Sequence, residues 1–199
     1  MQKLKDYYKQ NDPHDLTALN PPATDKDIKQ LEQALPGIMR LPKEYVEFLK
    51  LNNGSTSHRQ EVRDAYFKFG SWSALPIDRV LSSLNVLNDL LEEGDFDDRK
   101  IDKSSPGVQS VWWNPKWLPI FSNGRGNYLC IDFNPSSGGK IGQIIEYDRD
   151  FSERPVKFDS FLDMLDALVN KHLELTTEDW KVKTEPKSRL PTWLQWIAK

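Results

Sequence analysis

Asp132 is the carboxylate whose setting in the sequence most resembles a catalytic site. It lies in the run "FSNGRGNYLCIDFNP" (residues 121–135), close to two glycines and a basic residue. A carboxylate on a strand can act as a general base when a second group tunes its pKa. Asp132 with Asp148 would form such a site in a hydrolase. The alternative is that Asp132 accepts hydrogen bonds from the turn "NPSSGG" that follows it. Because the sequence shows no tuned partner, we favour the structural role and expect no enzymatic activity.

The glycines around Asp132 do not match known phosphate-binding loops. A dinucleotide-binding fingerprint needs three glycines before a helix, whereas Gly124 and Gly126 precede a strand-like run. The segment "SSGGKIG" lacks the first glycine of a P-loop and carries Ile141 where that motif needs serine or threonine. Asn123-Gly124 instead predicts a tight turn between two strands. We therefore expect no nucleotide cofactor.

Metal-binding motifs are also missing from the sequence. The three histidines are far apart, and no second histidine or cysteine stands at a ligand spacing. The acidic segment "DFDDRKIDKSSP" lacks the glycine of a calcium loop at its sixth position. Pro106 stands where that loop needs its bidentate glutamate. The sequence thus predicts no metal site and no cofactor.

The composition is that of a globular protein of moderate charge. The 199 residues are 38% hydrophobic and 29% charged, with a formal net charge of −3. This balance argues against direct nucleic-acid binding. No apolar run is long enough for a membrane span or a signal peptide, and the single cysteine, Cys130, lies in an apolar run. We expect a cytoplasmic protein in which Cys130 is a buried filler.

Six acids and no base occur in the run "DLLEEGDFDD" (residues 89–98). The run lies at the carboxyl end of a predicted helix, where the helix dipole disfavours negative charge. Helix stability therefore does not explain these acids. One interpretation is a surface for a basic protein partner, and the other is an ordinary solvated helix end. The six candidate partner-binding acids are Asp89, Glu92, Glu93, Asp95, Asp97 and Asp98.

Three of the seven tryptophans lie close together at Trp112, Trp113 and Trp117. Tryptophan is a frequent anchor at protein interfaces and also a large core residue. We expect at least two of the three to be core residues. Trp112 and Trp113 remain candidate partner contacts.

The hydrophobic periodicity predicts helices first, then strands, then a covering helix. Helical patterns cover residues 24–35, 42–53, 80–91 and 159–175, and strand-like runs cover 64–72, 116–123, 127–135, 142–150 and 155–159. This order predicts a single α+β domain with a twisted, mostly antiparallel sheet and flanking helices. We place the domain at residues 23–175, after an N-terminal helix or arm (1–22) and before a C-terminal tail (176–199).

The tail combines positive charge with an apolar stripe. Residues 181–199 hold five bases and one acid, and Trp193, Trp196 and Ile197 fall on one helical face. So short a helix is marginal alone, so the stripe should dock on the domain, on a second copy, or on a partner. We expect a monomer or a weak homodimer.

Several of these motifs, taken in order, resemble the SUKH superfamily, in its Smi/Knr branch of cell-wall-assembly regulators. The resemblance rests on "LPKEYVEFLKLNNG" and on the segment "WWNPKWLPIFSNGRGNYLCIDFNPSSGGKIGQII" downstream. It implies structural roles for a set of signature residues. These are Pro42, Asn53, Gly54, Trp117, Pro119, Gly124, Gly126, Asp132, Pro135, Gly139 and Gly142.

The resemblance implies an α+β fold and a non-enzymatic function. Bacterial members of the superfamily are mainly immunity proteins that neutralise toxins, often nucleases, while fungal members act in cell-wall signalling. A compact chain of this kind resembles the bacterial members. The first hypothesis is therefore an immunity protein with a toxin as its protein partner. The alternative is a regulatory protein-interaction scaffold without a toxin partner.

Overall fold

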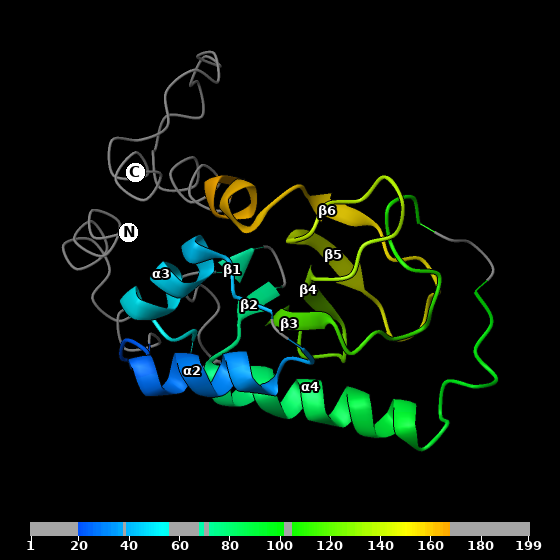
Figure 1. Cartoon of the computed structure of the whole chain (residues 1–199), viewed down its shortest axis with the longest axis horizontal. Helices are drawn as coiled ribbons and strands as arrows, with labels where there is room; N and C mark the ends of the chain where they lie inside the picture. The colour runs from blue at the N-terminus through cyan, green and yellow to red at the C-terminus, as the bar shows by residue number, and fades with distance from the viewer. Residues whose placement is uncertain (1–19, 38, 56–67, 70–71, 102–104, 168–199) are drawn as a thin grey trace, which may run out of the picture.

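A six-stranded antiparallel sheet forms the centre of the fold (Figure 1). The computed structural model describes residues 20–37, 39–55, 68–69, 72–101 and 105–167, and the statements below concern these residues. The strand order β1-β2-β3-β4-β5-β6 follows the sequence, and each strand pairs antiparallel with the next. The strands are β1 (Lys68–Phe69), β2 (Trp72–Ala74), β3 (Trp117–Ser122), β4 (Tyr128–Asp132), β5 (Gln143–Tyr147) and β6 (Val156–Phe158).

Three labelled helices and one further helical segment accompany the sheet. They are α2 (Asp25–Ala34), α3 (Lys43–Leu51), α4 (Ile77–Glu92) and residues 161–167. The side chain of Thr24 caps α2 by accepting from the Asp27 amide, and Asp27 returns the bond in a capping box. The predicted α+β class with an antiparallel sheet and flanking helices is thus confirmed.

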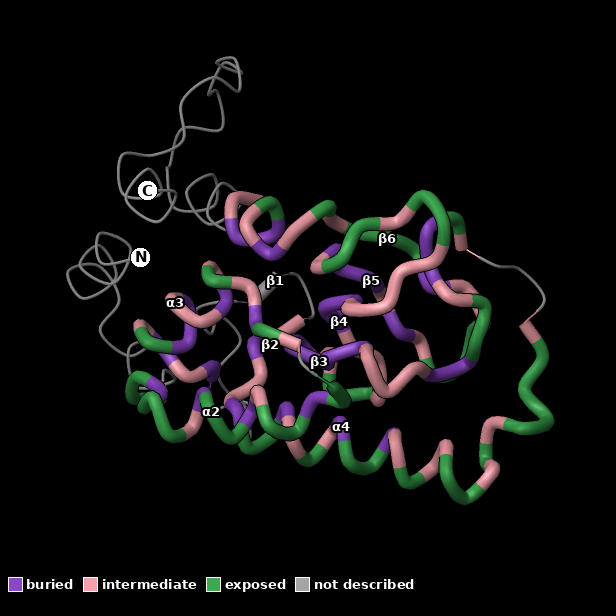
Figure 2. The backbone as a smooth tube through the Cα atoms, in the orientation of Figure 1, coloured by how far each residue is buried: buried purple, intermediate pink, exposed green. Residues whose placement is uncertain are grey.

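Helices α2 and α4 lie side by side along one side of the molecule, and α4 packs against β3 (Figure 1). Both helices turn a buried stripe inward and an exposed face outward (Figure 2). Helix α3 packs against residues 161–167 through aromatic edges, because the Phe161 ring lies 5.0 Å from Tyr45 and 5.6 Å from Phe48. Strands β3 to β5, at the centre of the sheet, are almost wholly buried.

The start of α4 is fixed by the end of α3. The Ile77 amide donates to Oδ1 of Asn53 at 2.9 Å, so an asparagine side chain takes up one of the free amides at the helix start. Gly54 has a φ of +70°, and a Cβ there would lie 2.4 Å from the backbone nitrogen of Pro76. Only glycine therefore fits this contact, which gives "NNG" its structural role.

A second close backbone contact joins the turn after β4 to the loop before β3. A Cβ on Gly139 would lie 2.0 Å from the carbonyl oxygen of Gly107. Beside this contact, Gln143 donates to the same Gly107 oxygen at 2.9 Å, and the Ser136 amide donates to it at 3.2 Å. The loop over residues 105–113 is thereby held against the sheet.

The hairpin predicted at "SNGRGN" is present between β3 and β4. Gly124 and Gly126 both have positive φ, and the Asn123 amide donates to the Asn127 carbonyl. Pro119, which has no amide proton to donate to a ladder, lies opposite Cys130 and directly before a register shift between β3 and β4. These residues shape the strands and do not form a phosphate loop.

Several element boundaries differ from the sequence prediction; strands β4 and β5, for example, are each shorter than the runs predicted over 127–135 and 142–150. Pro42 is the N-cap of α3 and not its first residue, and α4 begins at Ile77, three residues before the expected start at Val80. In the described part of the strand predicted over 64–72, the structure has the short strand β1 and the first residue of β2, which continues to Ala74. Most of the arm (1–22), the last residues of the predicted helix 159–175 and the whole tail (176–199) lie outside the described residues.

Candidate protein-interaction surface

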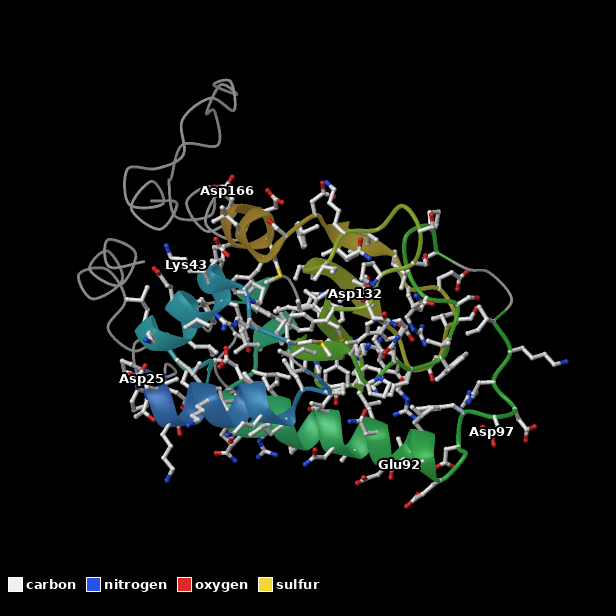
Figure 3. All side chains as sticks on the ribbon, viewed as in Figure 1. Asp25, Lys43, Glu92, Asp97, Asp132 and Asp166 are labelled. Carbon is white, nitrogen blue, oxygen red and sulfur yellow. The ribbon has the colours of Figure 1, made fainter. Side chains whose placement is uncertain are left out.

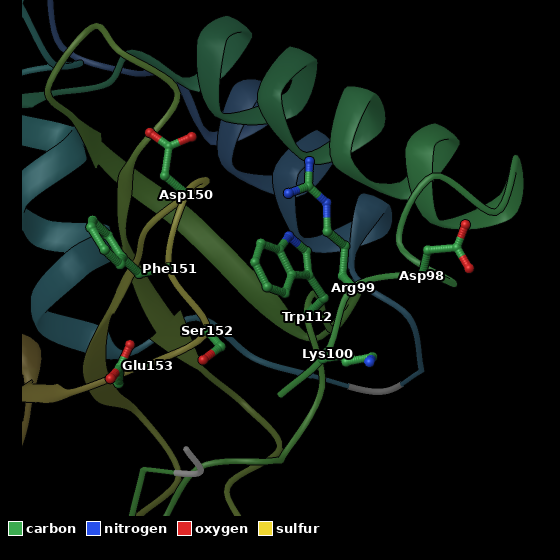
Figure 4. Close-up of a pocket in the computed structure, with 8 residues that line it drawn as sticks. All are labelled: Asp98, Arg99, Lys100, Trp112, Asp150, Phe151, Ser152 and Glu153. Carbon is green, nitrogen blue, oxygen red and sulfur yellow. The ribbon is translucent and has the colours of Figure 1, made fainter. Parts of the chain in front are cut away.

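An open groove of about 500 Å³ lies between the loop after α4 and the loop after β5 (Figure 4). Loops from two distant parts of the sequence form its sides, and Trp112 lies between them. We call this feature the groove. It is lined by Asp98, Arg99, Lys100, Trp112, Asp150, Phe151, Ser152 and Glu153.

Two guanidinium groups lie over the indole ring of Trp112. The Cζ atoms of Arg99 and Arg154 lie 5.0 Å and 5.1 Å from the Trp112 ring centroid. Arg154 also lies over the Tyr147 ring, at 4.5 Å. Cations attract the electron-rich faces of aromatic rings, most strongly where water is excluded. The stack therefore connects the exposed Arg99 with the core of the sheet.

Arg154 is a buried cation that ties the groove to the core. It is 2% exposed, and its guanidinium donates to the carbonyl oxygens of Phe151, Glu153 and Trp112. Its Nε atom has no hydrogen-bond partner, and no ion pair to it occurs among the described residues. Burial lowers the pKa of Arg154, but arginine stays charged in proteins.

The sequence prediction missed Arg154. It stands in the segment "SERPVKF", where nothing distinguishes it from a surface arginine. Its role depends on the chain bending back so that it meets Trp112, 42 residues earlier. The spacing of residues within one segment cannot predict a contact between residues so far apart in the sequence.

The carboxyl end of α4 is closed by a Schellman motif. The Asp95 amide donates to the Leu90 carbonyl and the Gly94 amide to the Leu91 carbonyl, while Gly94 has a φ of +82°. These bonds satisfy carbonyls that the helix leaves free. The backbone is thus fully organised at the point where the acids cluster.

The six acids around this motif are all exposed. Glu92 and Asp97 mark the cluster in Figure 3, at the end of α4 that leads into the groove. None of the six forms an ion pair with a described cation. We call this cluster the acidic end of α4. It is accessible to a partner, although a solvated helix end would have the same exposure.

The two candidate tryptophans have different positions. Trp112 is 8% exposed and lines the groove, so only a small part of its side chain is accessible. Trp113 is 2% exposed, donates from Nε1 to Asn88 at 2.8 Å and packs edge-on against Trp117 and Tyr147. In this structure Trp113 supports the groove from the core and does not reach the surface.

Asp132 lies inside the domain and accepts hydrogen bonds, as the structural interpretation predicted (Figure 3). Its Oδ1 accepts from the Asn134 amide at 2.8 Å and its Oδ2 from Gln143 at 2.9 Å. Burial raises the pKa of Asp132, and these bonds act in the opposite direction. Asp148 is too far from Asp132 to form a catalytic pair with it. In the β4–β5 register Asp132 lies opposite Gln143, whereas Asp148 follows Tyr147, which lies opposite Tyr128 at the other end of the ladder. The two aspartates lie at opposite ends of the β4–β5 ladder, five residues or about 17 Å apart along the strand.

The single thiol is inert in this setting. Cys130 is fully buried in β4, and burial raises the pKa of its thiol well above the ordinary value. No cluster of three or more metal-ligating side chains occurs among the described residues, which do not include the three histidines. No helix in that part of the chain is long and apolar enough to cross a bilayer.

Comparison with known proteins identifies the family of this fold. Residues 22–167 match the SMI1 / KNR4 family (SUKH-1). The chain belongs to this family. The match covers the whole sheet, the helices and the groove.

Three fungal relatives illustrate the similarity. The chain is 32% identical over 80 residues to the cell wall assembly regulator SMI1 of Saccharomyces cerevisiae, covering 39% of this chain and 15% of the regulator. It is 37% identical over 70 residues to the cell wall biosynthesis/cell cycle regulator smi1 of Schizosaccharomyces pombe (35% and 14%). It is 35% identical over 49 residues to a glucan synthesis regulatory protein of Neurospora crassa (25% and 9%). The matches thus cover only a small part of each relative's length.

Proposed function

We propose that this chain is a non-enzymatic protein-interaction domain that acts as a regulatory scaffold of the cell-wall-assembly type. The named relatives support this proposal, because they are regulators of cell-wall assembly, cell-wall biosynthesis and glucan synthesis. The regulatory role was the alternative in the sequence analysis, and it takes first place here for that reason.

The chemistry of the conspicuous side chains also supports a binding function. Asp132 is enclosed by hydrogen bonds, and Cys130 is enclosed by apolar strands. Accessible charged groups with an aromatic residue beside them are found instead at the groove and the acidic end of α4. Binding surfaces of this kind combine a few aromatic anchors with charge that complements the partner.

The exposed acids also favour a second candidate, an immunity protein that neutralises a toxin in the cytoplasm. A basic toxin, such as a nuclease that binds nucleic-acid phosphates, would complement these carboxylates, which form no ion pair with the described cations. This candidate and the regulatory scaffold share one surface and differ in the partner.

Affinity capture followed by titration tests the proposal. The full chain is immobilised, proteins of its source cells are captured and identified, and each binder is purified and titrated. We expect a saturable binder whose affinity falls at least about tenfold for the charge reversal Glu92→Lys. Asp78→Lys is the matched control, because Asp78 is an exposed acid at the opposite end of α4.

The identity of the binder separates the two candidates. A component of cell-wall synthesis or signalling supports the scaffold, and a basic toxin whose growth arrest is relieved by co-expression supports the immunity protein. Equal binding by Glu92→Lys and Asp78→Lys would refute the role of the acidic end of α4. Turnover of a small molecule that is lost in Asp132→Asn would refute the non-enzymatic function.

A further inference from the structure

The groove continues into the acidic end of α4 without a break in the chain. Asp98 belongs to both features, and the loop that carries Arg99 and Lys100 follows directly. Together the two features hold eight carboxylates and two cations. One of the cations, Arg99, is stacked on Trp112, and one carboxylate, Asp150, lies 3.6 Å from Arg149. The combined surface is therefore strongly acidic.

Phe151 gives this acidic surface an apolar contact point. It is 64% exposed and is the only aromatic among the large, strongly exposed hydrophobic residues that the structure describes. Its backbone is held by Arg154, which donates to the Phe151 carbonyl. An exposed aromatic ring on an organised backbone is suited to pack against a second aromatic side chain.

A segment of the same chain has the complementary chemistry. Residues 181–199, "KVKTEPKSRLPTWLQWIAK", hold five bases, one acid and the pair Trp193 and Trp196. Thirteen residues separate position 167 from the first of these bases, and at ~3.3 Å per residue they span up to about 43 Å. A domain of this size has a radius of gyration near 15 Å, so the connection is long enough to reach the groove.

We propose that residues 181–199 of this chain bind the groove, with Trp193 and Trp196 packed against Phe151 and the bases facing the acidic end of α4. The inference goes beyond the proposed function, because it concerns a contact within the chain and not an external partner. A tail bound there covers the surface to which a basic partner would bind. The tail and the partner therefore compete for the groove, and the bound tail lowers the apparent affinity of the chain for the partner.

Disulfide trapping in the full chain tests the contact directly. The double variant Ser152→Cys with Thr192→Cys places one thiol in the groove and one beside Trp193. The control pairs Thr192→Cys with Ile141→Cys, because Ile141 is 76% exposed and lies before β5, at the strand end opposite the groove. Cys130 adds little background, since it is fully buried.

We expect the intrachain disulfide to form at least about tenfold faster in the groove pair than in the control pair. Reversing three tail charges with Lys181→Glu, Lys183→Glu and Lys187→Glu, or adding 1 M salt, should bring the two rates together, because salt screens exposed charges. Equal rates in the two pairs would overturn the proposal. Disulfide-linked dimers would overturn it too, because the groove would then hold the tail of a second copy.

The result is independent of whether an external partner exists. Trapping reports the intrachain contact even if affinity capture finds no binder, and a captured binder leaves the trapping rates of the isolated chain unchanged. When both experiments succeed, competition adds a further readout. Trp193→Ala with Trp196→Ala should then bind the captured partner several-fold more tightly than the unmodified chain, and weaker or unchanged binding would overturn the competition.

Discussion

Replacing Arg154 by methionine should destabilise the domain, even though Arg154 lacks an ionic partner among the described residues. Methionine keeps most of the volume of the side-chain stem but has no N–H donor. Three carbonyl oxygens, those of Phe151, Glu153 and Trp112, would lose the donor that they share. The substitution thus measures how strongly one buried guanidinium holds the groove together.

The expected loss is about 3 kcal/mol. A carbonyl left without its partner costs roughly 1–3 kcal/mol, and the low end applies because Phe151 and Glu153 are not buried. Two contacts of Arg154 with aromatic rings are also lost, at roughly 1–2 kcal/mol each. The methionine avoids the desolvation cost of the guanidinium, several kcal/mol, which roughly offsets these ring contacts. The expected loss of about 3 kcal/mol therefore comes from the three carbonyls, at about 1 kcal/mol each.

Urea unfolding of the full chain measures this loss. We expect Arg154→Met to lower the free energy of unfolding by about 3 kcal/mol, which corresponds to a drop in Tm of about 6–12 °C. Arg154→Lys keeps the charge but not the planar fork and should lose about 2 kcal/mol. Arg149→Met, at an exposed arginine with one surface ion pair, should change stability by less than ~0.5 kcal/mol. A loss below about 1 kcal/mol in Arg154→Met would refute the reasoning.

Two further substitutions test the interior of the domain. Gly139→Ala should lower the free energy of unfolding by about 2–4 kcal/mol, because its Cβ would lie 2.0 Å from the Gly107 oxygen. If urea unfolding gave the variant the stability of the wild type, the loop around Gly107 would have to move aside at no cost, and the prediction would be wrong. Burial raises the pKa of Asp132, so the folded chain keeps this proton to a higher pH than the unfolded chain does. The resulting stabilisation is full below the unfolded pKa of about 4 and is lost as the pH rises through the folded pKa. The stability of the wild type minus that of Asp132→Asn should therefore fall as the pH rises from 4 to 7, and a constant or rising difference in urea unfolding would contradict it.

The fold could be predicted from local patterns because those patterns act over short distances. Thr24 caps α2 as expected, and "SNGRGN" forms the expected hairpin, since both signals lie within a few residues of the structure they specify. The structural role of Asp132 was also predictable, because one of its partners is Asn134, two residues away.

The groove could not be predicted in the same way, because its residues come from three separate segments. The acids of α4 were visible as a run, but their proximity to Trp112 and Phe151 depends on how two loops meet. The close approach of Gly107 to Gly139 is equally long in range. In both cases the sequence contains the residues and gives no sign that they are neighbours.

The order of the strands bears on how the domain folds. From β3 to β6, each strand pairs with the strand that follows it in the chain, across connections of five to ten residues. Contacts of this kind close small loops and form early, on the time scale of hairpins. The ladder between β2 and β3 instead closes a connection of 42 residues, which contains α4 and the loop over residues 105–113. Because a longer connection costs more entropy to close, we expect this ladder to form after the hairpins, and the groove, which lies on that connection and on the loop after β5, to be completed with it.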